Sequence, residues 1–251
     1  MTYCLAIAVD DGLVFCSDSR TNAGPDQVSA YSKMHRFPVG ATRVFVMLSA
    51  GNLATTQGVV NQLQRDMKKN AEVSLKTVEN MGEAAEYLGQ ISRSEQQKHA
   101  NPKGQSSFNP SVTLILGGQI DGERPEVFLV YREGNFITTS EHTPFLQIGE
   151  SKYGKPILDR IIMPKTSIAV AARCALVSMD STMRSNVTVG PPIELLLYKK
   201  DGYRLDHHLV LQAEDPYLLE LKKMWDDKIK QAFTELPGFK PSLFKTESAE
   251  R

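Results

Sequence analysis

The chain has 251 residues, the length of one large domain or two small ones and enough to bury a substantial core. Apolar residues make up 41% and charged residues 23%, as in ordinary globular proteins, and no apolar run approaches the roughly 18 residues of a membrane span. The 29 basic and 29 acidic residues give a formal net charge of zero, so there is no electrostatic case for binding nucleic acid or an anionic membrane.

The chain opens with a predicted β-hairpin. Residues 2–9 form a largely apolar strand pattern, Asp10-Asp11-Gly12 is a turn signal, and residues 13–17 form the second strand. A polar loop is expected over residues 22–30, and Lys33 opens a third short strand. Because a hairpin returns the end of its second strand to the start of the first, Asp18 is expected to lie near the N-terminus.

The rest of the chain alternates between predicted helices and strands. Apolar residues at spacings of three to four predict helices over residues 52–70, with Asn52 as the cap, and over 74–97, 152–163, 166–183 and 215–236. Apolar runs bounded by turn signals predict strands over residues 43–48, 111–116, 126–131, 135–139, 193–199 and 203–210. A polar loop is expected over residues 99–110, and the tail after Pro237 is expected to be loosely held.

This order of elements favours a layered α/β (α+β) domain, although the sequence by itself does not separate it from other α+β arrangements. We expect one domain over residues 1–212 and a helical extension with its tail over 213–251. The three cysteines are odd in number and form no Cys-x-x-Cys motif, which favours free thiols in a reducing compartment. The first twenty residues lack the basic start of a signal peptide, so we expect a cytoplasmic protein.

Thr2 is the first candidate for chemistry. Met1 is normally removed before a small residue, which would leave Thr2 with a hydroxyl and a free α-amine on adjacent atoms. An α-amine has a pKa of about 7.7–8.0, so it can serve as the base that activates its own hydroxyl. Asp18 and Lys33 complete the set, because a carboxylate keeps a nearby lysine charged and a charged lysine lowers the proton affinity of the hydroxyl.

No metal or cofactor site is predicted. His207 and His208 are neighbours in a predicted strand and would face opposite sides, and no other ligand-type residue stands at metal-binding spacing. The sequence also has neither the phosphate-loop nor the dinucleotide fingerprint.

The pattern resembles the proteasome β-subunit family of N-terminal-nucleophile hydrolases over roughly residues 2–210. The resemblance is carried by Thr2, by the segment from Gly12 to Arg20, by Lys33 and by the segment from Met47 to Thr55. Gln147-Ile148-Gly149-Glu150 is similar to the family's second glycine turn, although Glu150 stands at or beside a position that is serine in proteasome β-subunits. The Thr-Tyr-Cys start and the C-terminal extension are most similar to the bacterial Anbu group.

The resemblance implies a four-layer αββα sandwich and a set of roles. Thr2 would be the nucleophile, Asp18 and Lys33 its support, and the Gly51 amide part of the oxyanion hole. Arg20 would be a supporting residue that pairs with Asp18 or its neighbours. Asp180 and Ser185, followed by Asn186, are similar to a stretch of the bacterial peptidase HslV, which would place them near the Thr2 amine.

The expected activity is hydrolysis of peptide or amide bonds by a homo-oligomer, in rings or in a helical arrangement, without a cofactor. Three alternatives stay open: an HslV-like core that needs an ATPase partner, an amidase or transpeptidase acting on a small substrate, and a non-catalytic assembly subunit. Retention of Met1 would indicate the last, because it blocks the amine.

Overall fold

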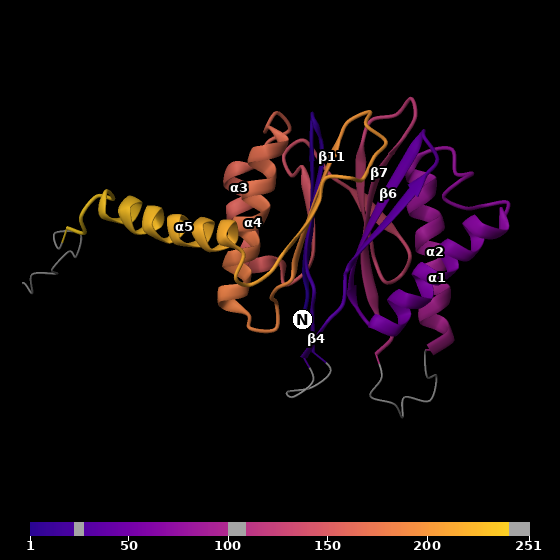
Figure 1. Ribbon diagram of the computed structural model, residues 1–251, viewed down its shortest axis with the longest axis horizontal. Helices are drawn as coiled ribbons and strands as arrows, with labels where there is room; N and C mark the ends of the chain where they lie inside the picture. The colour runs from indigo at the N-terminus through magenta and orange to yellow at the C-terminus, as the bar shows by residue number, and fades with distance from the viewer. Residues whose placement is uncertain (23–27, 100–108, 241–251) are drawn as a thin grey trace, which may run out of the picture.

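The computed structural model describes residues 1–22, 28–99 and 109–240, so most of the loop predicted over 99–110, part of the one over 22–30, and the end of the tail lie outside the described residues. Two five-stranded antiparallel sheets form the centre of the molecule (Figure 1). In strand order, the first sheet contains β10 (Phe145–Gly149), β1 (Tyr3–Val9), β2 (Gly12–Asp18), β11 (Ile193–Lys199) and β12 (His208–Leu211). The second contains β5 (Met34–Val39), β6 (Arg43–Gly51), β7 (Val112–Ile120), β8 (Glu126–Val130) and β9 (Phe136–Thr138). A short ribbon pairs β3 (Arg20–Asn22) with β4 (Val28–Ala30).

Helices cover both outer faces of the paired sheets. Figure 1 shows α1 (Leu53–Lys69) and α2 (Met81–His99) on one side, and α3 (Ser151–Ile161) and α4 (Ile168–Ser185) on the other. Three hydrophobic clusters fill the three interfaces: the first sheet against α3 and α4, the second against α1 and α2, and one between the sheets. The αββα sandwich implied by the resemblance is therefore confirmed.

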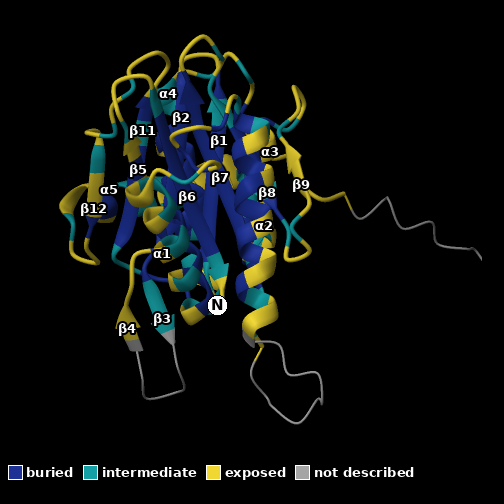
Figure 2. Cartoon of the chain, turned by 90° about the vertical axis from the view of Figure 1, so that its right-hand side faces the viewer, coloured by how far each residue is buried: buried dark blue, intermediate teal, exposed yellow. Residues whose placement is uncertain are grey.

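Strand β1 shows how the sequence specifies these layers. Successive side chains of a strand point to opposite faces. Tyr3, Leu5 and Ile7 pack toward α3 and α4, while Cys4 and Ala6 pack between the sheets. Both faces are buried, which explains why the strand reads as a nearly continuous apolar run (Figure 2).

Helix α5 (Pro216–Thr234) extends away from the sandwich (Figure 1). It begins at the N-cap Asp215 and packs on α4 through the buried Leu218 and the half-buried Leu221. Across the described ranges, none of the helices is both long and apolar enough to traverse a membrane.

Several predicted boundaries were wrong. Helix α2 begins at Met81 rather than near residue 74, because the Ser74 and Thr77 side chains hold a turn and Asn80 Oδ1 accepts the N–H of Glu83 at 2.8 Å. The predicted strand 203–210 is reduced to β12, since Tyr203 has a φ of 48°, outside strand geometry. Strands β3, β4 and β10 were not predicted, because each is short and lies beside polar or glycine-containing sequence.

Candidate active site

A cleft of about 320 Å³ opens where β1 begins and β6 ends. Its walls come from distant parts of the chain and include Thr2, Arg20, Lys33, Ser49, Gly51 and Gly149. Four predicted site residues, namely Thr2, Arg20, Lys33 and Gly51, therefore line one cleft. A larger depression of about 540 Å³ lies beside α2. Exposed charged side chains such as Glu86 and Arg93 line it, so we interpret it as an uneven part of the surface and not as a binding site.

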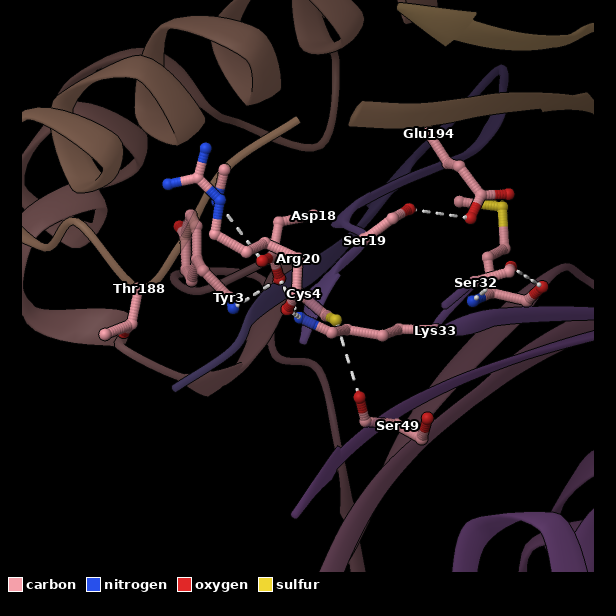
Figure 3. A network of polar contacts seen from close by, with 12 residues as sticks. Tyr3, Cys4, Asp18, Ser19, Arg20, Ser32, Lys33, Ser49, Thr188 and Glu194 are labelled. Atoms are coloured by element: carbon pink, nitrogen blue, oxygen red, sulfur yellow. Dashed lines mark hydrogen bonds and ion pairs between the residues drawn. The ribbon is translucent and has the colours of Figure 1, made fainter. Parts of the chain in front are cut away.

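Asp18 and Lys33 form a buried ion pair at the base of this cleft. Lys33 Nζ lies 2.7 Å from Asp18 Oδ1 and also donates to the Arg20 carbonyl at 2.7 Å (Figure 3). Asp18 is fully buried and Lys33 is 7% exposed. The Tyr3 N–H donates to Asp18 Oδ1 at 3.0 Å and the Gly190 N–H to Oδ2 at 3.3 Å. These contacts hold the lysine side chain in one place.

The electrostatics of the pair are set by its burial. Burial raises the pKa of Asp18 from its ordinary value, and the Lys33 ammonium with the two backbone N–H groups opposes that rise. An ammonium in a desolvated site acts strongly on neighbouring groups, because little water screens it. Lys33 is thus placed to stabilise negative charge on a hydroxyl that enters the cleft.

A hydrogen bond to its backbone carbonyl holds Thr2 at the edge of the cleft. It is half-buried, and its carbonyl accepts the N–H of Glu150 at 2.8 Å. Gly149 makes this approach possible: its φ is +82°, and a Cβ at this position would overlap the Thr2 carbonyl. The glycine turn that the resemblance singled out therefore seats Thr2 through its backbone.

Gly51 ends β6 directly before helix α1. The Ser49 N–H donates to the carbonyl of Lys33, the residue just before β5, at 3.0 Å, and the Asn52 N–H donates to the carbonyl of Ser111, just before β7, at 3.0 Å. Since ladder directions alternate along a strand, the Gly51 N–H points away from β7, to the side where β5 has not yet begun and the cleft opens. Asn52 caps α1 by accepting the Thr55 N–H at 3.1 Å, so the positive end of the helix also faces this region.

Arg20 forms part of the cleft wall. Its Nη1 donates to the Val187 carbonyl at 2.6 Å, and its guanidinium lies against Gly190, where a side chain would collide with it. Since the Gly190 N–H binds Asp18, Arg20 supports the carboxylate through this loop rather than by a direct ion pair.

The structure does not bring Asp180 and Ser185 to the cleft. Asp180 lies on the face of α4 turned to α5, with Oδ2 3.4 Å from Arg184 Nε and Oδ1 3.8 Å from Lys222 Nζ. Burial raises its pKa, opposed by Lys222 and Arg184. Ser178 two positions earlier contacts Tyr3, and two residues turn a helix by about 200°, so Asp180 points away. Ser185 is exposed at the end of α4.

Sequence reasoning missed one group beside the cleft, formed by Tyr3, Gln147 and Ser178. The Tyr3 hydroxyl lies 2.7 Å from Ser178 Oγ and accepts from Gln147 Nε2 at 2.5 Å. These residues are more than 140 positions from Tyr3, and no local pattern links them. The one available signal was a polar hydroxyl in an otherwise apolar strand. Within the described ranges, no group of three or more His, Cys, Asp or Glu side chains is arranged to hold a metal ion.

Comparison with solved structures finds close similarity over nearly the whole chain. Anbu (ancestral beta-subunit) from Yersinia bercovieri is 42% identical, with 95% of this chain and 99% of that chain covered and a TM-score of 0.89. Anbu from Hyphomicrobium sp. strain MC1 is 41% identical, with 95% and 100% covered and a TM-score of 0.86. The helical assembly of the Anbu complex from Pseudomonas aeruginosa is 39% identical, with 96% and 99% covered and a TM-score of 0.90. No family model and no curated protein sequence matches the chain.

Proposed function

Because this chain belongs to the Anbu family of proteasome β-subunit-like proteins, we propose that it is a threonine-type hydrolase that cleaves amide bonds with Thr2 after removal of Met1. The observation that carries the proposal is the desolvated Lys33 ammonium, held 2.7 Å from Asp18 in the cleft that Thr2 and Gly51 share. Such a group supplies the positive charge that a hydroxyl nucleophile requires.

The proposed reaction is acyl transfer in two steps. Thr2 Oγ attacks the amide carbonyl, and its proton passes to the Thr2 amine, directly or through a water molecule. The negative charge on the tetrahedral oxygen is stabilised by the Gly51 N–H, and Lys33 lowers the cost of forming the alkoxide. The amine then gives the proton to the leaving nitrogen as the C–N bond breaks. Water hydrolyses the resulting ester and restores the Thr2 hydroxyl.

Mass spectrometry of the intact protein after incubation with a threonine-directed β-lactone tests this proposal. We expect loss of Met1 and one stoichiometric adduct that maps to Thr2. Thr2→Ala should form no adduct while keeping the fold, and labelling of that variant would contradict the assignment. Loss of Met1 without an adduct would point to a missing partner such as an ATPase, and retained Met1 would favour the non-catalytic assembly subunit.

We further propose that the chain works as a homo-oligomer and that α5 supplies one contact. One stripe of α5 carries Leu218, Leu221, Trp225, Ile229 and Phe233 at helical spacing. Exposure rises along this stripe, from buried Leu218 through half-buried Trp225 to 48% at Ile229 and 73% at Phe233. The face that begins in the core therefore continues into solvent as the helix leaves the body (Figure 1).

The occupant proposed for this stripe is a second copy of the chain. The base of α5 is fixed in direction by ion pairs that join Arg184 to Asp226 and Lys222 to Asp180. A relative that covers 96% of this chain forms a helical assembly. A contiguous apolar stripe on a projecting helix is the feature expected of such a contact.

The double variant Ile229→Asp/Phe233→Asp tests this contact. We expect sedimentation velocity to show smaller particles than for the wild type, because two charges would be buried in the contact. Gln231→Asp/Thr234→Asp, which places the same charges away from the stripe, should sediment like the wild type. Unchanged assembly of the stripe variant would refute the role of α5.

A further inference from the structure

Tyr3, the residue after Thr2, is tied into the fold at both its side chain and its backbone. The side chain is fully buried, and its hydroxyl joins Ser178 of α4 at 2.7 Å to Gln147 of β10 at 2.5 Å. Its backbone N–H donates to Asp18 Oδ1 at 3.0 Å. One residue therefore links helix α4 and the edge strand β10 to the buried carboxylate of the candidate site.

The hydroxyl of Tyr3 is not required for packing. Its ring lies in the apolar cluster between the first sheet and α3 and α4, where phenylalanine would fill the same space. A buried hydroxyl is unfavourable unless it is hydrogen-bonded, and here two partners from different elements satisfy it. Helix α3 leaves room for this group, since a Cβ on Gly154 would overlap both the Tyr3 hydroxyl and Ser178 Oγ. Burial raises the pKa of the phenol, so it stays protonated at neutral pH.

The peptide plane between Thr2 and Tyr3 is clamped on both of its polar groups. Its carbonyl, from Thr2, accepts the Glu150 N–H at 2.8 Å, and its N–H, from Tyr3, donates to Asp18. The Cα atoms of Thr2 and Tyr3 are about 3.8 Å apart, so a shift of Tyr3 passes almost undiminished to Thr2. The two contacts of the Tyr3 hydroxyl block such a shift, because they hold the far end of the side chain.

We propose that Tyr3, with its hydroxyl held by Ser178 and Gln147, is a positioning residue for Thr2. It fixes the peptide plane from which the nucleophile projects, so that Thr2 Oγ stays beside Lys33. This inference rests on the proposed function of Thr2. Misplacement of a reacting group by about 1 Å can cost about a hundredfold in rate, so loss of the hydroxyl has a measurable kinetic consequence.

The test compares Tyr3→Phe with a matched control, Tyr198→Phe. Tyr198 is also a buried tyrosine with a hydrogen-bonded hydroxyl, 2.6 Å from Gln119 Oε1, but it pairs with Leu13 at the other end of β2. We expect Tyr3→Phe to slow β-lactone labelling of Thr2 by about ten- to a hundredfold. Both variants should lower the melting temperature by similar amounts, because each loses a buried, hydrogen-bonded hydroxyl. Thr2 in Tyr198→Phe should still be labelled at the wild-type rate.

A cycle with Ser178→Ala separates positioning from general loosening of the fold. If the two hydroxyls act as one unit, the rate of the Tyr3→Phe/Ser178→Ala variant should equal that of the slower single variant. Wild-type labelling rates in Tyr3→Phe, with only the melting temperature lowered, would overturn the proposal and leave the proposed function intact.

A second readout does not depend on reactivity. Amide hydrogen exchange at the Tyr3 N–H reports directly on its bond to Asp18. We expect exchange to quicken by about tenfold in Tyr3→Phe and to be unchanged in Tyr198→Phe. This readout still applies to a wild-type protein that has lost Met1 but takes no label, because it does not require a reactive Thr2. Unchanged exchange in Tyr3→Phe would then overturn the positioning role by itself.

Discussion

Replacement of Lys33 by methionine should destabilise the protein strongly, because it leaves the Asp18 carboxylate buried without its partner. Asp18 is fully buried and the Lys33 side chain is 9% exposed, so solvent screens the pair little. At 2.7 Å, with an effective dielectric constant of about 20, the attraction is about 6 kcal/mol. Since desolvation of both groups opposes it, loss of one partner should cost about 3–5 kcal/mol. For a domain of this size, that lowers the melting temperature by roughly 6–20 °C.

The pH dependence of this loss has a defined sign. Burial already raises the pKa of Asp18, and removal of the ammonium raises it further. A carboxyl with a higher pKa in the folded chain than in the unfolded chain binds protons preferentially when folded, so its stability penalty shrinks as the pH falls through the folded-state pKa. The melting-temperature difference between Lys33→Met and the wild type should therefore narrow from pH 7 to pH 5.

Thermal melts of Lys33→Met and of Asp18→Asn/Lys33→Met at both pH values provide the check. The double variant removes the stranded charge, while the amide oxygen of the new side chain can still accept the N–H of Tyr3, so it should recover most of the lost stability. Wild-type stability of Lys33→Met at pH 7, or a deficit that widens on acidification, would refute the reasoning.

Three further predictions follow from local geometry. Gly149→Ala should lower the melting temperature and abolish labelling of Thr2, because the added Cβ would overlap the Thr2 carbonyl. Gly122→Ala is the control, since Gly122 has a similar φ of +83° but open space around it. It should cost only the backbone strain of about 1–2 kcal/mol and leave labelling unchanged. Lys222→Met should loosen α5 from Asp180, which limited proteolysis would detect as faster cleavage at the base of the helix. Native protein should resist iodoacetamide at pH 8 and react fully when unfolded, because burial raises the pKa of all three thiols, to about 12 at Cys174.

The fold was largely predictable where one physical signal dominated. Strand β1 is apolar on both faces because it lies between two layers, and Asn52 is a cap because its side chain accepts the Thr55 N–H. Strand β10 escaped prediction, since Gly149 at its end is read locally as a turn and only pairing with β1 makes the segment a strand. Register between distant strands carries no local signature.

In the candidate site too, the features with a local sequence signal were predictable and the others were not. The convergence of Asp18 with the N-terminus followed from hairpin geometry, and the Asp18–Lys33 contact has the expected form. The sequence does not indicate which face of α4 meets the sheet, because Asp180 and Ser178 are both polar and lie two positions apart. The structure turns Ser178 inward to Tyr3 and leaves Asp180 to α5.

Met1 lines the same cleft as Thr2. Chain ends are usually the most mobile part of a domain, but this one is fastened by the Glu150 bond to Thr2 and the Asp18 bond to Tyr3. Under the proposed function, a peptide joined ahead of Thr2 would block the Thr2 amine and continue from the cleft that Met1 lines. A purification tag therefore belongs at the other end of the chain, and an inert preparation carrying an N-terminal tag says nothing about the chemistry of Thr2.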